Sequence, residues 1–411
     1  MFWNDKAIKE RLACRRLYVP NLLRRSRIAH GVPRNRELGM KIMWRALTFV
    51  CLWMGAWTCV QGGETSTQPQ PDAHSPAHAS AMAPDTLADM PLWAYGITTL
   101  PQPGDTAKPQ DWGRQFNPAI DRDEQLKPVL HVAGSSRTYA RIDLSDWANA
   151  VDWFPDEHAP MPDVVQHGSA KLGEKKRACA FCHRVNGGGR PENAPIAGLP
   201  VEYFLRQLDD FRSGRRRSTD PRKPNVPTMI GIAQAISHDE ARAAAEYYAG
   251  QSGAPRIRII ESDRAPPLQL HGNLFVATSN ERTEPLTDRI AEVLDGEHEQ
   301  FNDNPHVGYM AYVPLGGIER GRAMVAASSA GAQTAAMPAA QSCTACHGAD
   351  LHGLGPAPPL AGRSPSYLVR QLYDFKTGAR DGSLAPLMKP VASRLSTQQM
   401  TDIAAYIASL P

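Results

Sequence analysis

The chain has 411 residues, a formal net charge of +3, 32 Gly, 35 Pro and 7% aromatic residues. That length suits two or three domains, and so weak a charge excludes the strong positive field typical of nucleic-acid-binding proteins. The Gly and Pro content indicates many loops, as expected where a bound group supplies part of the core. Four of the seven Cys lie in two short motifs, and the other three precede the predicted globular part, which therefore has no disulfide framework.

Residues 1–60 are interpreted as a start region followed by a signal peptide or anchor, with Met40 or Met43 as the true start. Basic residues after each of these Met precede the apolar run 46–60, which has the length of a signal-peptide core. The run is too short for a comfortable transmembrane span. We expect export to the periplasm, and simple cleavage, an uncleaved anchor or lipid attachment at Cys59 remain alternatives.

Two segments separate this leader from the first repeated unit. Residues 61–89 are rich in Pro, Ser, Ala, Gln and His, and they predict a disordered linker because they cannot bury a core. Residues 90–162 are polar, with scattered Trp and Pro, and their periodicity supports short strands at best. We interpret residues 90–162 as an irregular extension that packs on the first unit.

Two motifs share the pattern Cys-x-x-Cys-His, at Cys179–His183 and at Cys343–His347. Two thiols on one helical turn can each add to a vinyl group of haem, and the adjacent His then faces the iron as its proximal ligand. One motif alone could be a zinc knuckle or a thioredoxin-like redox site, but two copies within a longer repeat favour two c-type haems. The predicted attachment residues are Cys179, Cys182, Cys343 and Cys346, and the predicted iron ligands are His183 and His347. Because covalent haem attachment takes place outside the bacterial cytoplasm, these motifs agree with an exported protein.

The motifs belong to an internal duplication with an offset of 164 residues. Tyr203, Arg206, Gln207, Leu208, Asp210, Phe211 and Gly214 fall on Tyr367, Arg370, Gln371, Leu372, Asp374, Phe375 and Gly378. These segments have helical spacing and end at Gly214 and Gly378, and Ser237 and Ser396 are expected to cap a final helix in each unit. A short helix should precede each motif, with Gly168 and Gly321 allowing close crossing of the last helix. The second unit adds an Ala/Ser/Gly-rich loop at 326–341.

The two predicted cytochrome-type domains are therefore 163–252 and 317–411, and residues 253–316 form an interdomain insertion. Strands are predicted at 256–260, 273–278 and 309–313, and a helix is predicted at 286–294. The fold class is mainly α, namely two tandem class I cytochrome c domains with an irregular N-terminal extension and a small β-containing insertion.

A haem iron held by one His needs a second ligand for electron transfer or an open position for catalysis. Met229 and Met388 lie at equal distances before the cap residues Ser237 and Ser396, in Pro-rich segments expected to be loops. This recurrence predicts that they are the axial ligands opposite the His. Met400 is expected in the core, and His238 and His352 are weaker ligand candidates because neither has a counterpart in the other unit.

Several residues near the motifs have possible supporting roles. Arg190 and Arg363 could bind haem propionates or be solvated, and Pro195 and Pro359 could offer a carbonyl to the proximal His. The basic run 215–217 could dock an acidic redox partner, although a solvated turn is the preferred interpretation.

On these residues the chain resembles the dihaem c-type cytochromes of the cytochrome c4 and cytochrome c553-like group. The resemblance covers about residues 163–252 and 317–411, and it implies a periplasmic electron shuttle that serves a dehydrogenase or a terminal oxidase. The long extension and the insertion depart from a compact cytochrome c4, which leaves the partner and the packing of the two haems open.

Three functional hypotheses remain from the sequence. The first is an electron carrier, not an enzyme, between a dehydrogenase or quinol-oxidising donor and a terminal oxidase or other acceptor. The second is a cytochrome subunit of a dehydrogenase or oxidase complex, docked through the extension and the insertion. The third is a dihaem peroxidase, which would need one open or His/His-ligated iron and is disfavoured by two matched Met.

Overall fold

The computed structural model describes residues 87–107, 120–252, 257–271, 274–278, 282–295, 304–329 and 342–411. All of these lie in one contact-defined unit that begins at Ala77. The predicted start region, the leader with Cys59, most of the linker 61–89 and the loop residues 330–341 lie outside the described residues. No helix in the described ranges is both long enough and apolar enough to span a membrane.

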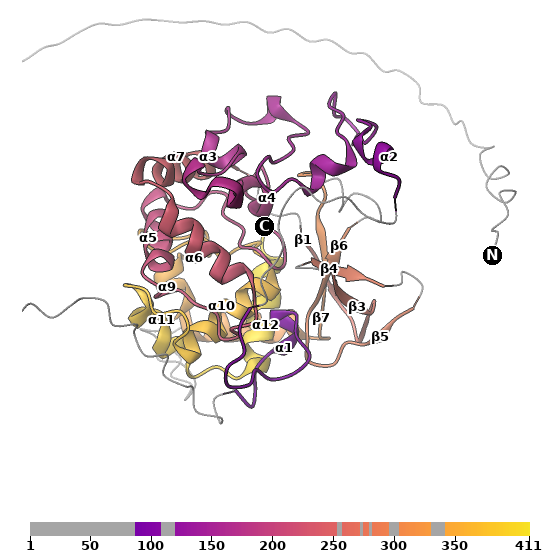
Figure 1. The fold of residues 1–411 in the computed structure, drawn as a ribbon. Helices are drawn as coiled ribbons and strands as arrows, with labels where there is room; N and C mark the ends of the chain where they lie inside the picture. The colour runs from indigo at the N-terminus through magenta and orange to yellow at the C-terminus, as the bar shows by residue number, and fades with distance from the viewer. Residues whose placement is uncertain are drawn as a thin grey trace, which may run out of the picture. The chain divides into compact units, whose positions relative to one another are not determined.

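The first repeated unit contains the helices that the sequence predicts and one further helix, α6, in the segment expected to be a loop (Figure 1). They are α3 (Asp163–Gln166), α4 (Cys179–His183), α5 (Val201–Arg212), α6 (Asn225–Ala235) and α7 (His238–Ala249). On α5 the buried apolar residues Phe204, Leu205, Leu208 and Phe211 follow helical spacing and enter the core. The predicted cap of α7 is confirmed, because Ser237 Oγ accepts from Glu240 N while the Glu240 carboxylate accepts from Ser237 N.

The second unit repeats this arrangement with α8 (Gly317–Ser329), α9 (Cys343–His347), α10 (Pro365–Thr377), α11 (Ala385–Ala392) and α12 (Thr397–Ser409). Ser396 and Gln399 form the corresponding capping box at the start of α12. Gly378 follows α10 with a positive φ of 77°, as a helix-terminating glycine requires. Residues 326–329, which were expected to be part of a loop, continue α8.

The predicted glycine contact with the last helix is right in one unit and wrong in the other. A Cβ at Gly321 would lie 2.0 Å from Asp402 O, so α8 crosses α12 at a distance that only glycine allows. Gly168 instead follows the single turn of α3 with φ +72°, and its nearest neighbour is the backbone of Arg177. The first unit therefore has no helix long enough to make the equivalent crossing at this position.

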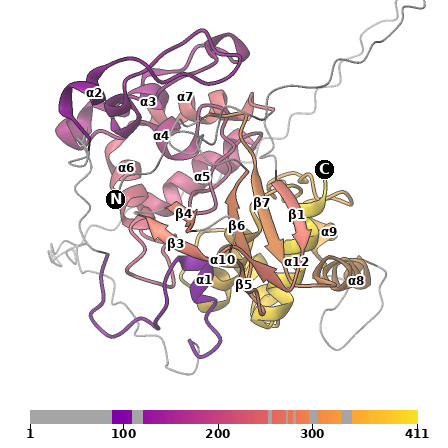
Figure 2. The same ribbon diagram turned by 90° about the vertical axis from the view of Figure 1, so that its right-hand side faces the viewer.

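The insertion between the units contains seven short strands within the described residues. They are β1 (Ile257–Glu261), β2 (Arg264–Ala265), β3 (Leu268–His271), β4 (Leu274–Ala277), β5 (Glu284–Pro285), β6 (Ala291–Leu294) and β7 (Tyr309–Val313). β7 lies between β1, to which it is parallel, and β6, to which it is antiparallel. Figure 2 shows this sheet beside α12, and both β1 and β7 contact that helix.

The three predicted strands are confirmed, but the helix predicted at 286–294 is wrong. Leu286, Ile290 and Val293 have helical spacing, yet β6 pairs with β7 in the register Ala291 to Tyr312 and Leu294 to Tyr309. The chain turns at Thr287, where φ is +54°. Backbone pairing with an available strand therefore overrides a short apolar pattern.

The extension packs on both units, whereas the sequence interpretation placed it on the first alone. Its first helix, α1 (Leu92–Tyr95), contacts α10 of the second unit, and the Tyr95 hydroxyl donates to Asp374 Oδ1 at 2.7 Å. Its later part contains α2 (Arg122–Leu126) and 3₁₀ turns, and Trp153 is buried in a cluster there. Instead of the short strands expected there, the described part has one isolated bridge, between Leu130 and Tyr139. The predicted mainly helical class with small sheets is confirmed.

Candidate functional site

One cavity of about 1090 Å³ is lined by both helical units, from α4 to α7 in the first and from α9 to α12 in the second. All eight residues predicted to hold haem line it: Cys179, Cys182, His183, Met229, Cys343, Cys346, His347 and Met388. Their convergence on one cavity is the central geometric feature of the molecule. Its walls are mostly apolar side chains, which suits a large planar apolar group.

The proximal-ligand candidates are oriented by backbone carbonyls, as expected, but the donor–acceptor pairs differ by one residue from the prediction. His183 Nδ1 lies 2.8 Å from Ala194 O, and His347 Nδ1 lies 2.8 Å from Pro358 O. The expected acceptors were Pro195 and Pro359. Because a carbonyl can only accept, Nδ1 carries the proton in both rings, which leaves Nε2 as the metal-binding nitrogen.

The ionisation of these groups favours the same assignment. Burial lowers the pKa of both His183 and His347, which keeps the imidazoles in the neutral form that binds iron. As free thiols, Cys179 and Cys343 have pKa values raised by burial to about 12 and about 11. The four cysteines form no disulfide. In the described part of the chain no three His, Cys, Asp or Glu side chains converge as a metal-binding group, so the donor set fits covalent haem better than a zinc knuckle.

Met229 and Met388 line the cavity from helices rather than from the loops that the sequence suggested. Met229 lies in α6 and Met388 lies in α11, where Pro386 is tolerated in the first helical turn. Their role as axial ligands stays a prediction. Met400 is fully buried in the second core, as expected.

The rival ligand candidates lie elsewhere. His238 is the exposed first residue of α7, and the exposed His352 ring lies 3.1 Å from the backbone oxygen of Asp350. Neither residue lines the cavity.

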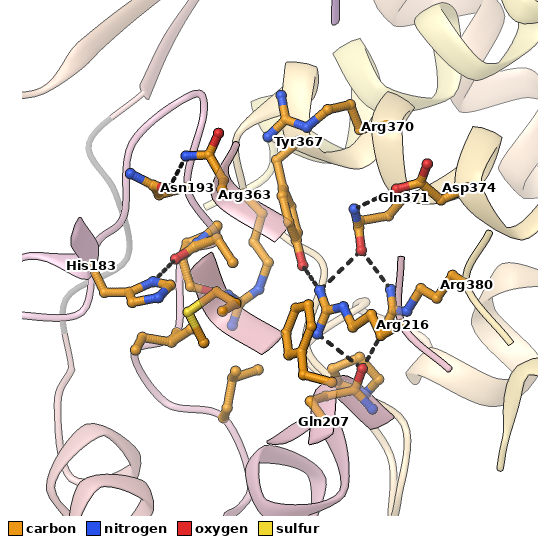
Figure 3. A pocket seen from close by; sticks show the side chains of 18 of the residues that line it. His183, Asn193, Gln207, Arg216, Arg363, Tyr367, Arg370, Gln371, Asp374 and Arg380 are labelled. Carbon is orange, nitrogen blue, oxygen red and sulfur yellow. Dashed lines mark hydrogen bonds between the residues drawn. The ribbon is translucent and has the colours of Figure 1, made fainter. Parts of the chain in front are cut away.

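A symmetric cluster of side chains joins the two units at the cavity wall (Figure 3). Arg216 donates to Gln207 Oε1, Gln371 Oε1 and the Tyr367 hydroxyl, each at 3.0 Å. Arg380 donates to Gln371 Oε1 at 3.0 Å, to Gln207 Oε1 at 2.7 Å and to the Tyr203 hydroxyl at 2.8 Å. Each arginine belongs to one unit and shares the glutamines of both, so we call these six residues the arginine clamp.

The interpretation of residues 215–217 as a solvated turn is wrong for Arg216, although Arg215 and Arg217 are exposed. Arg216 is buried, pairs through its backbone with Arg380 and lies over the Phe211 ring at 4.6 Å. Arg380 lies over Phe375 in the same way, at 4.4 Å. The offset of 164 residues also relates Arg216 to Arg380, so extending the repeat alignment by a few residues would have identified the pair.

Both arginines proposed for haem propionates line the cavity, and that role stays a prediction. Arg363 is buried and donates to Pro195 O and Ala197 O of the first unit, which makes it a second link between the units. Arg190 is half-buried, with one guanidinium nitrogen 3.5 Å from Phe181 O.

The surroundings of the two motifs differ. The Trp147 ring of the extension stacks on Phe181 at 4.6 Å, and its carbonyl accepts from Ala178 N at 2.8 Å. Gln125, Arg141, Leu144 and Ser145 of the extension also line the cavity. In the second motif, the counterpart of Phe181 is Ala345, which is exposed together with Cys346. The sequence predicted that the extension packs on the first unit, but it did not identify Trp147 as the residue over the motif, because nothing in residues 120–154 resembles a haem-binding pattern.

Comparisons with known proteins agree with the geometry. The sequence profile of the family described as Cytochrome c matches residues 328–411. Cytochrome c4 of Pseudomonas aeruginosa is 43% identical over 249 residues, which is 59% of this chain and 89% of that protein. The thiosulfate dehydrogenase electron acceptor of Stutzerimonas stutzeri is 43% identical over 81 residues, but this match spans 19% of the chain and 36% of that relative.

Among solved structures, reduced recombinant cytochrome c4 from Pseudomonas stutzeri superposes with a TM-score of 0.36 and 22% identity, covering 57% of this chain and 93% of that one. Its low TM-score adds nothing to the sequence comparison, which carries the assignment by covering nearly all of a relative at high identity. The chain therefore belongs to the cytochrome c4 family of c-type cytochromes, which implies haem c.

Proposed function

We propose that the protein is an exported dihaem electron carrier, with one c-type haem attached to each Cys-x-x-Cys-His motif. The convergence of two His and two Met on one cavity, with a His and a Met from each unit, carries this proposal. Bound haem would supply an iron that gains and loses one electron. His/Met ligation gives a higher reduction potential than His/His ligation, which suits transfer toward a terminal acceptor.

The protein's own residues would do three things for such a group. The four thiols hold it covalently, Ala194 O and Pro358 O fix the orientation of the two imidazoles, and the apolar walls keep water away from the iron. The arginine clamp and Arg363 hold the two halves of the cavity together. A peroxidase would need one open or His/His-ligated iron, and the presence of one Met candidate from each unit in the cavity favours a carrier instead.

We propose a periplasmic location and a redox protein as partner. The relatives named as electron acceptors of thiosulfate dehydrogenase make a sulfur-compound dehydrogenase one candidate donor. A role as a docked subunit is the second candidate, favoured by the extension, which contacts both units. Export and any membrane tether at the N-terminus follow from the leader pattern and belong to the same proposal.

The first experiment is a spectroscopic haem count on protein expressed with a haem-attachment system. We expect two haems per chain by pyridine haemochrome, and a weak red thioether–iron band that falls by half in Met229→Ala and in Met388→Ala. Met400→Ala is the matched control, since its buried thioether does not line the cavity, and it should keep the full band. A high-spin haem that binds carbon monoxide or peroxide in the unmodified protein would replace the carrier proposal with an enzyme.

The partner is tested by stopped-flow reduction with a purified thiosulfate dehydrogenase and thiosulfate. Fast reduction that saturates with protein concentration would support this donor. Stable co-purification with a dehydrogenase from its native host would favour the subunit role instead.

A further inference from the structure

A buried acid, Glu192, lies in the cavity wall of the first unit. Glu192 is 3% exposed, and neither of its carboxylate oxygens has a hydrogen-bond partner among the described residues. It follows Pro191 in the loop that connects the first motif to the carbonyl of Ala194, and it lines the cavity. Leaving a buried carboxylate unbonded is expensive in free energy, so such a group is retained where its charge or its proton has a use.

Several charged and titratable groups face this carboxyl from different elements. Arg190 comes from the same loop, Lys223 from the turn before α6, and Arg370 from α10. Asp374 and Asp220 act on Lys223, and Tyr95 of α1 bonds to Asp374. Within the described part of the chain, Glu192 forms no ion pair with these cations, and the Arg370 guanidinium donates instead to the carbonyls of Ala94 and Pro191.

Opposing effects act on the pKa of the Glu192 carboxyl. Burial raises the pKa of the Glu192 carboxyl above its usual value, and Arg190, Lys223 and Arg370 lower it. Burial also lowers the pKa of Lys223 to about 7. Loss of one positive charge from the cavity would raise the pKa of this carboxyl further and so favour its protonated form.

The acid belongs to the first unit alone. The offset of 164 residues places Pro356 opposite Glu192, so the second unit has no carboxyl at this position. The two units thus differ at this position, where only the first has a carboxyl that could take up a proton when the site gains an electron.

We propose that Glu192 is a proton acceptor coupled to the redox state of the first haem, which deepens the electron-carrier function proposed above. When the donor protein delivers one electron, the site loses one positive charge, and the Glu192 carboxylate takes one proton from water to form an O–H bond. Reoxidation sends the electron to the acceptor and returns the proton to solvent. The charge of the first cavity therefore stays constant through the cycle.

The test is a redox titration of the whole protein at several pH values. The reduction equilibrium of one haem should shift by up to tenfold per pH unit, which is about 59 mV for one electron. Met229→His should lower the reduction potential of the first haem and so identify it, and the haem that shifts with pH should be this one. Glu192→Gln should abolish the shift, and Glu192→Asp should keep it. Glu292→Gln is the matched control, because Glu292 is a buried acid that does not line the cavity, and its loss should leave the shift intact.

A second readout does not depend on the stability of the variant. The infrared difference between reduced and oxidised protein should show the carbonyl band of a newly protonated carboxylic acid, and reduction in weak buffer should take up protons. A pH dependence that survives in Glu192→Gln, or the absence of both the band and proton uptake, would overturn the inference while leaving two titrating haems and the carrier function in place. If the first haem does not titrate as a low-spin carrier, the proposed function itself fails.

Discussion

The two haem units share an internal design and differ in what surrounds them. Each has a Cys-x-x-Cys-His helix, a carbonyl that orients the His, a Met on the second helix after the motif and one arginine of the clamp. The first motif lies under Trp147 of the extension, whereas Ala345 and Cys346 of the second are exposed. The second unit is instead supported at α10 and α12 by α1 and the insertion sheet. Duplication therefore set the chemistry of the cavity, and segments outside the repeat made its halves unequal.

The largest expected effect concerns helix crossing, which the units do not share. Gly321→Ala would place a methyl group 2.0 Å from Asp402 O, and we expect a loss of about 3 kcal/mol of unfolding free energy. Denaturant unfolding followed by far-UV circular dichroism measures it. Gly250→Ala is the control, since its new Cβ meets atoms at ordinary distances of 3.5 Å or more in the first unit. Equal stability of the two variants would show that α8 does not cross α12 this closely.

The arginine clamp should respond symmetrically. Arg216→Leu and Arg380→Leu each leave one Tyr hydroxyl without its arginine donor, while both Gln oxygens keep the bond from the remaining arginine, and we expect each to cost about 2 kcal/mol. The double variant should lose more than the sum, because only then do the shared oxygens of Gln207 and Gln371 lose both arginine donors. Thermal and denaturant unfolding measure these changes, and the exposed Arg217→Leu is the control. Strongly unequal single effects would mean that the clamp serves one unit more than the other.

Glu292 should make the stability of the second unit depend on pH. Among the described residues, no acid occupies the equivalent place beside α5 in the first unit. Its carboxylate accepts from Ser364 Oγ at 2.9 Å beside the N-terminus of α10, whereas the first turn of α5 follows Pro200 and has no side-chain cap. Burial raises the pKa of Glu292 to about 7. The folded state therefore binds this proton more tightly than the unfolded state.

The sign of this effect follows from linkage. The stabilisation is complete below the usual carboxyl pKa of 4.5 and is lost as pH rises through about 7, with a slope of at most about 1.4 kcal/mol per pH unit. Unfolding free energies at pH 5, 6 and 7 measure the slope, and Glu292→Gln should flatten it. A slope that is unchanged in this variant would assign the dependence to another group.

The smallest effect is expected at the cover of the first motif. Trp147→Ala removes the stack on Phe181 and should lower the unfolding free energy by about 1 kcal/mol. It should also raise the rate at which a bulky reductant reduces the first haem, without changing the second. Equal reduction rates in the unmodified protein and the variant would show that the extension does not restrict access.

The sequence predicted what depends on local chemistry. The motifs, both capping boxes, the glycine after α10 and the strands β1, β4 and β7 follow from short-range rules, and the structure confirms them. The eight haem-binding candidates converge because the duplication preserves their spacing. Their ligand roles are tested by the spectra proposed above.

The errors arose where long-range contacts decide. Residues 286–294 form strand β6 because β7 was available for pairing, and Arg216 is buried because Arg380 and Tyr367 lie opposite it. α1 packs against α10, far along the sequence, which no local pattern could indicate. The same holds for Glu192, because the cations that act on its carboxyl come from three separate segments of the chain.

Because both units line the cavity, the order of haem attachment and folding matters for this protein. We expect the haem-attachment machinery to reach the thiols of the first motif before Arg363 and the arginine clamp close the two halves on one another, whereas Cys346 of the second motif is exposed even after closure. Closure before attachment would bury empty apolar walls and bury Cys179 as a thiol of high pKa that reacts slowly. The interface between the two units therefore favours one order of maturation, in which haem is attached before the halves dock.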